Sequence, residues 1–313
     1  MGDIILTSPI VRCVKFQMNA KIHFLTKAKY VPIMKFNPYV DKIITLEDKL
    51  KDTLKVLQNE NYNCIIDLHN NLRSLLIKIN LGIMNYTTKK DNWKKFLLIY
   101  FRLNFLKDHV VERHFKTIKK LSIMNDNQGL DYFLNSDTDV DFNIHQSFLA
   151  WCIGASSNQK TLSEEQIINV CNNIAIPVVL IGGAQEHKKG ASIVMKSTNS
   201  KIYNFCGDLS LDQSAYLTKN SSLVLTNDTG LMHIASAFHK PIISFWGCTK
   251  PILGFTPYMN KSTCINMVIN PDKEPCSKHG SYCKIDKEGC VKKISYQSII
   301  QLISDFHQDY IIH

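Results

Sequence analysis

Residues 226–238, TNDTGLMHIASAF, place polar side chains where a buried strand should give way to a helix. Asp228 or Thr229 can cap this helix, and Gly230 leaves its first turn open. The backbone N–H groups of that turn, together with the helix dipole, favour a bound anion. His233, about one turn further on, could donate a hydrogen bond to the same anion. The segment therefore predicts either an anion-binding helix start or an ordinary helix cap.

Two more predicted strands end in residues that could bind a ligand. VVLIGGAQE ends in Gly182, Gly183 and Glu186, and IGASSNQK ends in Lys160. Because the carboxyl ends of parallel strands meet at one crevice, a carboxylate there could accept hydrogen bonds from a ribose, and a lysine could reach the same place. The alternatives are a tight glycine turn without a ligand and a solvated lysine.

A third strand end, CIIDLHNNLRS, carries Asp67 and leads to Arg73 and Ser74 at the start of a helix. The chain has 37 lysines and arginines, but only four of them are arginines. A planar, bidentate donor in so lysine-rich a chain indicates a phosphate or carboxylate contact. A surface arginine that caps or pairs locally is the alternative.

Short apolar runs alternate with helical patterns along the chain, which predicts two parallel-sheet domains. The boundary is expected at residues 145 and 146, within the polar stretch 135–146, so that the domains comprise residues 1–145 and 146–313. The last helix, about residues 295–308, has an apolar stripe and is expected to pack back across the domain junction. The chain opens at Gly2 and Asp3, inside the loop that normally follows the first strand. That strand is therefore expected to be absent from the N-terminal sheet.

Composition narrows the functional classes. The 313 residues are 45% hydrophobic and carry a net charge of +10, without a run of about 18 apolar residues or a secretory signal. A cytoplasmic protein is expected. The charge fits nucleic acid, an anionic membrane or an anionic substrate, and no nucleic-acid-binding motif supports the first. Residues 89–107, basic and then aromatic at helical spacing, predict either a helix on an anionic membrane or a core helix.

The ten cysteines lie mostly in apolar runs and are expected to be reduced core residues. The exceptions are Cys276, Cys283 and Cys290, which are seven residues apart and enclose His279. These four side chains could bind zinc, but zinc sites usually pair cysteines two to four residues apart. The spacing favours a thiol-rich loop without a metal.

Four segments together resemble glycosyltransferase family 9, the heptosyltransferases of lipopolysaccharide core assembly. They are GDIILTSPIV, CIIDLHNNLRS, LTNDTGLMHIASAFHKPIISFWG and PCSKHGSYCKIDKEGC. The resemblance implies the GT-B fold, in which two Rossmann-like domains face a central cleft. It also implies inverting, metal-independent and cofactor-independent transfer of a sugar from a nucleotide diphosphate, typically ADP-heptose. The acceptor would be a lipid-anchored saccharide of the lipopolysaccharide core type at the anionic, cytoplasmic face of the inner membrane.

The resemblance also assigns roles to residues. Asp3 is expected to be the general base. The expected donor-binding residues are Lys160, Gly182, Gly183, Glu186, Asp228, Thr229, Gly230 and His233. The expected acceptor-binding residues are Gly2, Asp67, Arg73 and Ser74. Two alternatives remain open, a non-catalytic nucleotide-sugar-binding remnant and a GT-B nucleotide-sugar epimerase.

Overall fold

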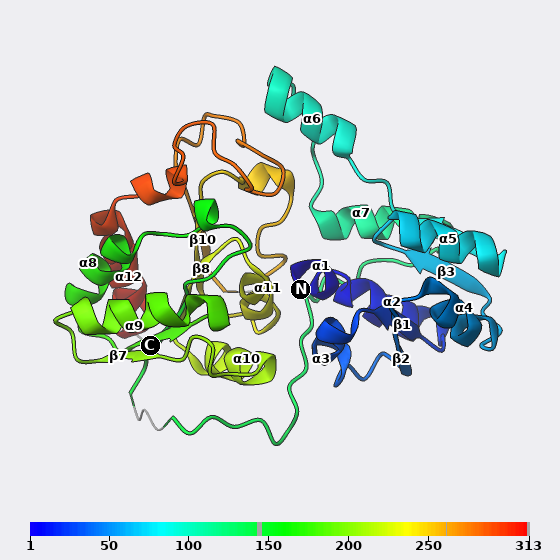
Figure 1. The fold of residues 1–313 in the computed structure, drawn as a ribbon, viewed down its shortest axis with the longest axis horizontal. Helices are drawn as coiled ribbons and strands as arrows, with labels where there is room; N and C mark the ends of the chain where they lie inside the picture. The colour runs from blue at the N-terminus through cyan, green and yellow to red at the C-terminus, as the bar shows by residue number, and fades with distance from the viewer. Residues whose placement is uncertain (143–145, 261, 312–313) are drawn as a thin grey trace.

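The computed structural model describes residues 1–142, 146–260 and 262–311 and shows two α/β domains (Figure 1). They are joined by the polar stretch predicted as the boundary, of which residues 143–145 lie outside the described residues. The predicted architecture of two parallel-sheet domains is confirmed. No helix in the described ranges is long and apolar enough to cross a membrane.

The C-terminal domain is built on six parallel strands in the order β10-β9-β8-β5-β6-β7. The strands are β5 (Leu149–Cys152), β6 (Val178–Ile181), β7 (Ile202–Asn204), β8 (Leu223–Asn227), β9 (Ile242–Trp246) and β10 (Cys264–Val268). This is the doubly wound order. Successive strands are added outward from β5 to β6 and β7, and then outward on the other side of β5, from β8 to β9 and β10. Strands β5, β6, β8 and β9 are buried at every position, which explains their uninterrupted apolar sequences.

Helices cover both faces of this sheet. They are α8 (Glu164–Asn172), α9 (His187–Lys196), α10 (Leu211–Asn220), α11 (Gly230–Ala237) and α12 (Tyr296–Ile311), with short 3₁₀ turns η3 (Asn158–Lys160), η4 (Ala184–Glu186), η5 (Pro251–Leu253) and η6 (Cys290–Lys293). Ser163 caps α8 and Ser210 caps α10, each through a reciprocal capping box with a glutamine three residues later. The loop residues before each helix thus fix where it begins.

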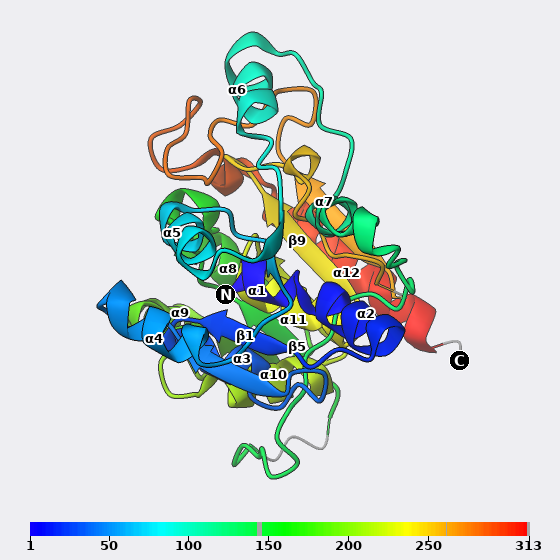
Figure 2. The same cartoon turned by 90° about the vertical axis from the view of Figure 1, so that its right-hand side faces the viewer.

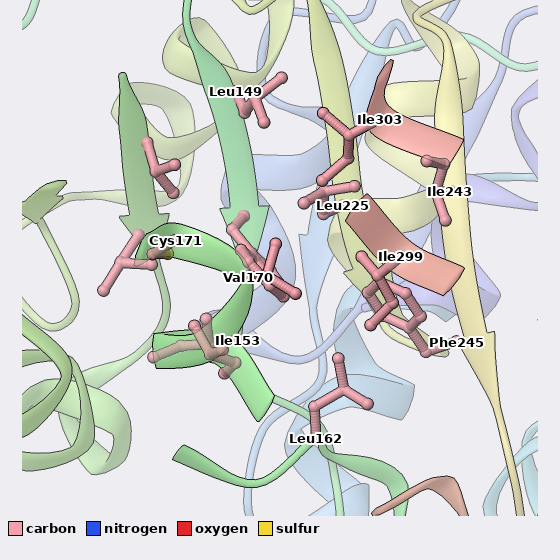
Figure 3. Packing of buried hydrophobic residues seen from close by; sticks show 14 of the residues in the cluster. Leu149, Ile153, Leu162, Val170, Cys171, Leu225, Ile243, Phe245, Ile299 and Ile303 are labelled. Carbon is pink, nitrogen blue, oxygen red and sulfur yellow. The ribbon is translucent and has the colours of Figure 1, made fainter. Parts of the chain in front are cut away.

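The last helix, α12, departs from the prediction. Its buried residues Ile299, Ile303 and Phe306 belong to a core with β5, β8 and α8 of the same domain (Figure 3). Among the described residues its apolar face therefore does not pack back across the domain junction. The apolar stripe of α12 packs against α8 and the sheet, because these elements present a continuous apolar surface to the helix.

The N-terminal domain contains two separate pairs of parallel strands. β1 (His23–Thr26) pairs with β2 (Lys42–Thr45), and β3 (Cys64–Asp67) pairs with β4 (Met84–Thr87). Among residues 1–142 no strand joins β1 to β3, which is where the first strand of a doubly wound sheet would lie. The expected absence of that strand is confirmed for the described residues.

Helices precede, separate and follow these strands along the chain. They are α1 (Gly2–Ile5), α2 (Ser8–Met18), α3 (Val31–Met34), α4 (Leu50–Gln58), α5 (Leu72–Leu81), α6 (Asn92–Phe101) and α7 (Val110–Thr117), with 3₁₀ turns η1 (Ala28–Tyr30) and η2 (Lys119–Leu121). Ile5, Leu6 and Ile10 from α1, α2 and the turn between them form one core with Val111 and Phe115 of α7. Helix α6 stands apart from this core at the far end of the domain (Figures 1 and 2).

Arg12 shows why the scarcity of arginine is a weak guide to phosphate sites. This side chain is 4% exposed and makes a bidentate contact with Asp126 at 2.7 and 2.8 Å. It also bonds to Asp131 and to the carbonyl of Gly129. The planar guanidinium here serves the fold, because it anchors α2 to the segment around residue 130.

Candidate functional site

A cleft of about 820 Å³ lies between the two domains, beyond the carboxyl ends of the C-terminal strands. Met1, Gly2 and Asp3 line it from the N-terminal domain. Gly154, which follows β5, and Asp228, which follows β8, line it from the other side. These two residues mark the place where the strand order reverses, which is where open α/β sheets bind their ligands.

The start of α11 forms part of this cleft. Thr229 is its N-cap, and its Oγ1 accepts a hydrogen bond from the N–H of Leu231 at 3.2 Å. The helix start faces α1 across the domain boundary (Figure 1). A β-carbon on Gly2 would lie 2.9 Å from Cδ2 of His233, and one on Gly230 would collide with Met1. Glycine at both positions therefore lets the domains approach closely enough to bring Asp3 to the helix start.

His233 lines the cleft with a neutral ring. The side chain is 3% exposed, and its Nδ1 has no hydrogen-bond partner among the described residues. Burial lowers the pKa of His233 to about 4, since the charged imidazolium would lose its hydration. A buried polar atom without a partner is costly, and it is the other edge of the ring, with Cδ2 and Nε2, that lies against Gly2 at the cleft.

Lys160 and Asp228 form an ion pair in the cleft wall. Nζ of Lys160 lies 2.6 Å from Oδ2 of Asp228, and the hydroxyl of Thr249 donates to the same oxygen at 2.9 Å. The lysine side chain is 8% exposed and the aspartate side chain 15%. Asp228 can only accept hydrogen bonds when ionised, so it orients Lys160 and does not itself bind an anion.

Glu186 occupies a notch made by glycines. Its Oε2 accepts a hydrogen bond from the N–H of Gly183 at 2.9 Å. A β-carbon on Gly154 would lie 2.9 Å from Cδ of Glu186, and one on Gly182 would lie 2.8 Å from its Cβ. The glycines make room for the carboxylate and bring it to the cleft lining, as the ribose-binding prediction requires.

The predicted acceptor residues other than Gly2 do not line this cleft. Asp67 is buried, 2.7 Å from Nζ of Lys78, which holds the pKa of the carboxyl below its usual value despite burial. Ser74 forms a capping box with Asn71 at the start of α5. The side chains of Asp67 and Ser74 thus stabilise the turn after β3 and the start of α5. Arg73 is exposed on α5 and remains a prediction.

The cleft also contains residues that the sequence patterns did not indicate. Lys278 and His279 line it from the loop before η6. Gly280, at φ +72°, packs on Lys160 so closely that a β-carbon would lie 2.5 Å from Cδ of the lysine. The sequence carries no signal for this contact, because the positive φ of Gly280 is seen only in the structure.

A buried lysine lies near the same wall. Nζ of Lys95 sits 4.8 Å from the ring centre of Phe255, which lines the cleft. Burial, reinforced by the charges of Arg113 and Lys278, lowers the pKa of Lys95 to about 8. This side of the cleft therefore concentrates positive charge around an aromatic surface.

The three cysteines of the thiol-rich loop do come together, but without His279. Their fourth neighbour is Cys248, which follows β9, whereas the imidazole of His279 lines the cleft. The set of three thiols and one imidazole that was considered as a possible zinc site is therefore corrected to four thiols. Cys152 and Cys171 are buried, as expected for core thiols.

Comparisons with known proteins agree with this architecture. The family model described as Glycosyltransferase family 9 (heptosyltransferase) matches residues 51–285. The chain is 22% identical to lipopolysaccharide heptosyltransferase 1 of Campylobacter coli over 343 aligned positions, covering 99% of this chain and 97% of that protein. It is similar in fold to a family 9 glycosyltransferase from Veillonella parvula, with a TM-score of 0.77, 18% identity and coverage of 98% and 94%. The ADP-heptose lipopolysaccharide heptosyltransferase II of Escherichia coli gives a TM-score of 0.74, 19% identity and coverage of 99% and 96%.

Proposed function

Since the chain belongs to glycosyltransferase family 9, we propose that it transfers a sugar from a nucleotide diphosphate to a saccharide of the lipopolysaccharide core, with inversion at the anomeric carbon. ADP-heptose is the expected donor, because the structurally similar Escherichia coli enzyme is named an ADP-heptose heptosyltransferase and the Campylobacter coli relative is named a heptosyltransferase. The observation that carries the proposal is the single cleft lined by Asp3 on one side and by Lys160, Thr229 and His233 on the other.

The donor fits the C-terminal side of this cleft. Its diphosphate would lie at the start of α11, where the N–H groups and helix dipole favour negative charge. Lys160 would neutralise part of that charge, and His233 would donate a hydrogen bond. Glu186 would accept hydrogen bonds from the ribose hydroxyls. Asp228 would act on the donor through Lys160, because its carboxylate forms an ion pair with that lysine.

The transfer step follows from this placement. Asp3 takes the proton of the acceptor hydroxyl as that oxygen attacks the anomeric carbon from the face opposite the diphosphate. The bond between the anomeric carbon and the diphosphate oxygen breaks, and the nucleoside diphosphate leaves with the bonding electrons. Lys160 and the amides of α11 stabilise the negative charge that develops on the leaving group. We propose that transfer needs no metal, because these groups supply the positive charge that a metal would supply.

The acceptor is proposed to be anionic. Lys95, Lys278 and Arg113 place positive charge on the acceptor side of Asp3, near Phe255. Burial and the charges of Lys278 and Lys95 lower the pKa of His279, so its ring is neutral. Phosphate or carboxylate groups on a core saccharide would complement this charge. The positive residues belong to α6, α7 and the thiol-rich loop, so the acceptor would enter beneath α6.

Helix α6 is proposed to rest on the anionic cytoplasmic face of the inner membrane. Its apolar residues Trp93, Phe96, Tyr100 and Phe101 are 43–69% exposed. Three of these rings contact Phe96, with centroids 4.9–5.8 Å apart, so they form one aromatic patch. Exposed lysines precede the helix at residues 89 and 90. Aromatic residues beside lysines are typical of helices that lie on an anionic bilayer.

The transferase proposal is tested with Asp3→Asn in the full-length protein, ADP-heptose and a lipid A acceptor. Transfer is expected to fall by about 10²- to 10⁴-fold, as for loss of a general base, while ADP affinity is retained. Asp52→Asn is the matched control, because Asp52 is an exposed carboxylate on α4 whose contact with Lys55 is 3.8 Å long. The control should keep its activity within about twofold. Product anomer analysis tests inversion.

Three results would contradict the proposal. Asp3→Asn with nearly full activity would exclude Asp3 as the base. A wild-type protein that binds ADP but transfers no sugar would be the non-catalytic remnant. A protein that isomerises the donor sugar without an acceptor would be the epimerase.

The membrane proposal is tested by sedimentation with vesicles. Binding is expected to anionic phosphatidylglycerol vesicles and to be much weaker with phosphatidylcholine, since the lysines contribute about 1 kcal/mol each near an anionic surface. Trp93→Ser combined with Phe101→Ser should abolish it. Met195→Ser, which removes an equally exposed apolar side chain from α9, should not. Equal binding by both variants would show that α6 is not the contact surface.

A further inference from the structure

Four cysteine side chains converge beside the cleft, outside its lining. Cys248 follows β9, Cys276 and Cys283 lie in the loop after β10, and Cys290 begins η6. Their Sγ atoms all lie within 4.8 Å of one another. Three of the four are buried and Cys283 is half-buried. Four soft ligand atoms from three separate segments therefore surround one point.

The spacing of the sulfur atoms matches a metal centre. Sγ of Cys276 lies 3.7 Å from Sγ of Cys283, whereas a disulfide bond is about 2.05 Å long. Four thiolates bound to zinc at about 2.3 Å in a tetrahedron lie about 3.8 Å from one another. Cys276 and Cys283 are thus at the distance that tetrahedral ligation needs, and the other sulfur pairs lie within 4.8 Å, so a small inward shift of their side chains would complete the site.

The backbone next to the sulfurs supports this arrangement. The N–H of Asp286 donates to Sγ of Cys283 at 3.4 Å, and the N–H of Cys276 donates to the carbonyl of Cys248 at 2.9 Å. N–H groups that point at a sulfur stabilise a thiolate ligand and fix its orientation. The cysteines are held by local contacts as well as by their mutual proximity.

Glycines beside two of the cysteines permit the convergence. A β-carbon on Gly247 would lie 2.6 Å from the backbone N of Val291. Gly289 has φ +107°, and a β-carbon there would overlap the backbone of Gln159. The chain just before Cys248 and just before Cys290 therefore approaches other backbone more closely than any larger residue allows.

The loop that carries these cysteines has only a small apolar core of its own. The described residues 269–289 contain no helix or strand. Among the described hydrophobic residues other than the cysteines, Ile269 is the one that packs against the thiol cluster. Long segments without secondary structure or a core are uncommon in compact domains and need another source of order. A structural metal provides it, because its ligands close the loop.

The same loop reaches both functional surfaces. It carries Lys278 and His279 to the cleft. It also contacts α6, where Nζ of Lys284 donates to the carbonyl of Ile99 at 2.7 Å and the hydroxyls of Tyr282 and Tyr100 lie 3.1 Å apart. Whatever orders the loop thus fixes the cleft wall relative to the helix of the other domain.

We propose that Cys248, Cys276, Cys283 and Cys290 hold one metal ion, with zinc as the expected occupant, in a tetrahedral site that orders the loop between the cleft and α6. The site is structural, because all four positions are filled by protein and none is open to substrate. Its existence does not rest on the proposed transferase activity. Only the expected effect of metal loss on sugar transfer depends on the proposed function.

Metal content tests the site directly. Full-length protein purified under reducing, oxygen-free conditions is expected to contain about one zinc or iron per chain by elemental analysis. After removal of the metal, cobalt(II) should give the visible absorption bands of a tetrahedral tetrathiolate centre, and this measurement needs no variant. Less than about 0.1 metal per chain, together with no uptake of zinc or cobalt, would overturn the proposal. A disulfide within the cluster, found by mass spectrometry of the reduced preparation, would also overturn it.

Variants then identify the ligands. Cys276→Ser should lose the metal, whereas Cys64→Ser, at a half-buried cysteine of β3 outside the cluster, should keep it. His279→Ala should also keep it, and metal loss in this variant alone would contradict the four-thiol assignment. Trypsin should cut residues 270–289 only after the metal is removed, since the loop is rich in lysine. Equal resistance of the two forms would show that no metal orders this loop.

Discussion

The ion pair between Lys160 and Asp228 gives the sharpest test of how the cleft handles charge. Both side chains are largely buried, and their charged atoms lie 2.6 Å apart. Removing one partner of a buried pair costs about 3–5 kcal/mol. Asp228→Asn keeps an acceptor for Thr249, so we expect the lower value, about 3 kcal/mol. For a domain of this size, that corresponds to a fall of about 6–12 °C in the thermal midpoint.

ADP binding is expected to change differently when Asp228 or Lys160 is replaced. In the wild type the diphosphate must share Lys160 with the carboxylate of Asp228, which repels it. Asp228→Asn leaves a buried lysine without an anion, so ADP should bind at least as tightly and should restore more stability than in the wild type. Lys160→Met leaves the carboxylate facing the diphosphate. It should weaken ADP binding by about 10- to 150-fold, the value of a charge-assisted hydrogen bond of about 1.5–3 kcal/mol.

Thermal unfolding with and without ADP, together with calorimetric ADP titration, measures both effects. Glu288→Gln is the control, because its carboxylate is 78% exposed in a contact of 3.4 Å with Lys292 and should change the midpoint little. Equal loss of ADP affinity in Asp228→Asn and Lys160→Met would refute the reasoning, since Asp228 would then contribute to donor binding as strongly as the lysine. No change in either variant would place the diphosphate elsewhere.

Two further predictions concern the notch and the buried histidines. Gly154→Ala should displace Glu186, whose Cδ would lie 2.9 Å from the new methyl group, and weaken ADP binding by about 10-fold. Gly183→Ala, with its nearest contact at 3.4 Å, should leave ADP affinity nearly unchanged, and equal effects would contradict the role of the notch. Burial lowers the pKa values of His114 and His233 to about 4, below the unfolded value of about 6.5, so the stability they confer is complete above pH 6.5 and is lost as the pH falls toward 4. Urea unfolding at pH 7.5 and 5 should show a loss of about 2 kcal/mol per histidine, and a flat profile would exclude neutral burial.

Burial explains which strands could be predicted. β5, β6, β8 and β9 are buried on both faces, and each is an unbroken apolar run in the sequence. β4 and β10 are sheet-edge strands whose residues are half-buried or exposed, and neither contains an unbroken apolar run. An edge strand needs no continuous apolar run, so MNYT and CINMV carry no clear periodicity.

The residues that line the cleft from the C-terminal strand ends were predictable for a related reason. Lys160, Glu186 and Asp228 each lie within eight residues of the end of a buried strand, and the doubly wound order brings those strand ends together. The cleft wall near Phe255 and the thiol-rich loop has no such guide. Lys95 lies inside a helix whose aromatic residues dominate the pattern, and Lys278 lies in a loop without regular structure. Neither position has a neighbouring strand end to indicate that it lies near the cleft.

The four thiols show what spacing rules leave out. Rules of two to four residues describe ligands that one tight turn presents to a metal. Here Cys276, Cys283 and Cys290 lie seven residues apart, and the fourth thiol, Cys248, comes from the end of β9. Cys248 was not predicted, because WGC resembles any buried strand end. The sheet fixes Cys248, and the glycines beside it and beside Cys290 allow the loop to fold over it. A site closed by long-range chain geometry leaves no local motif, so only the sulfur positions in the fold reveal it.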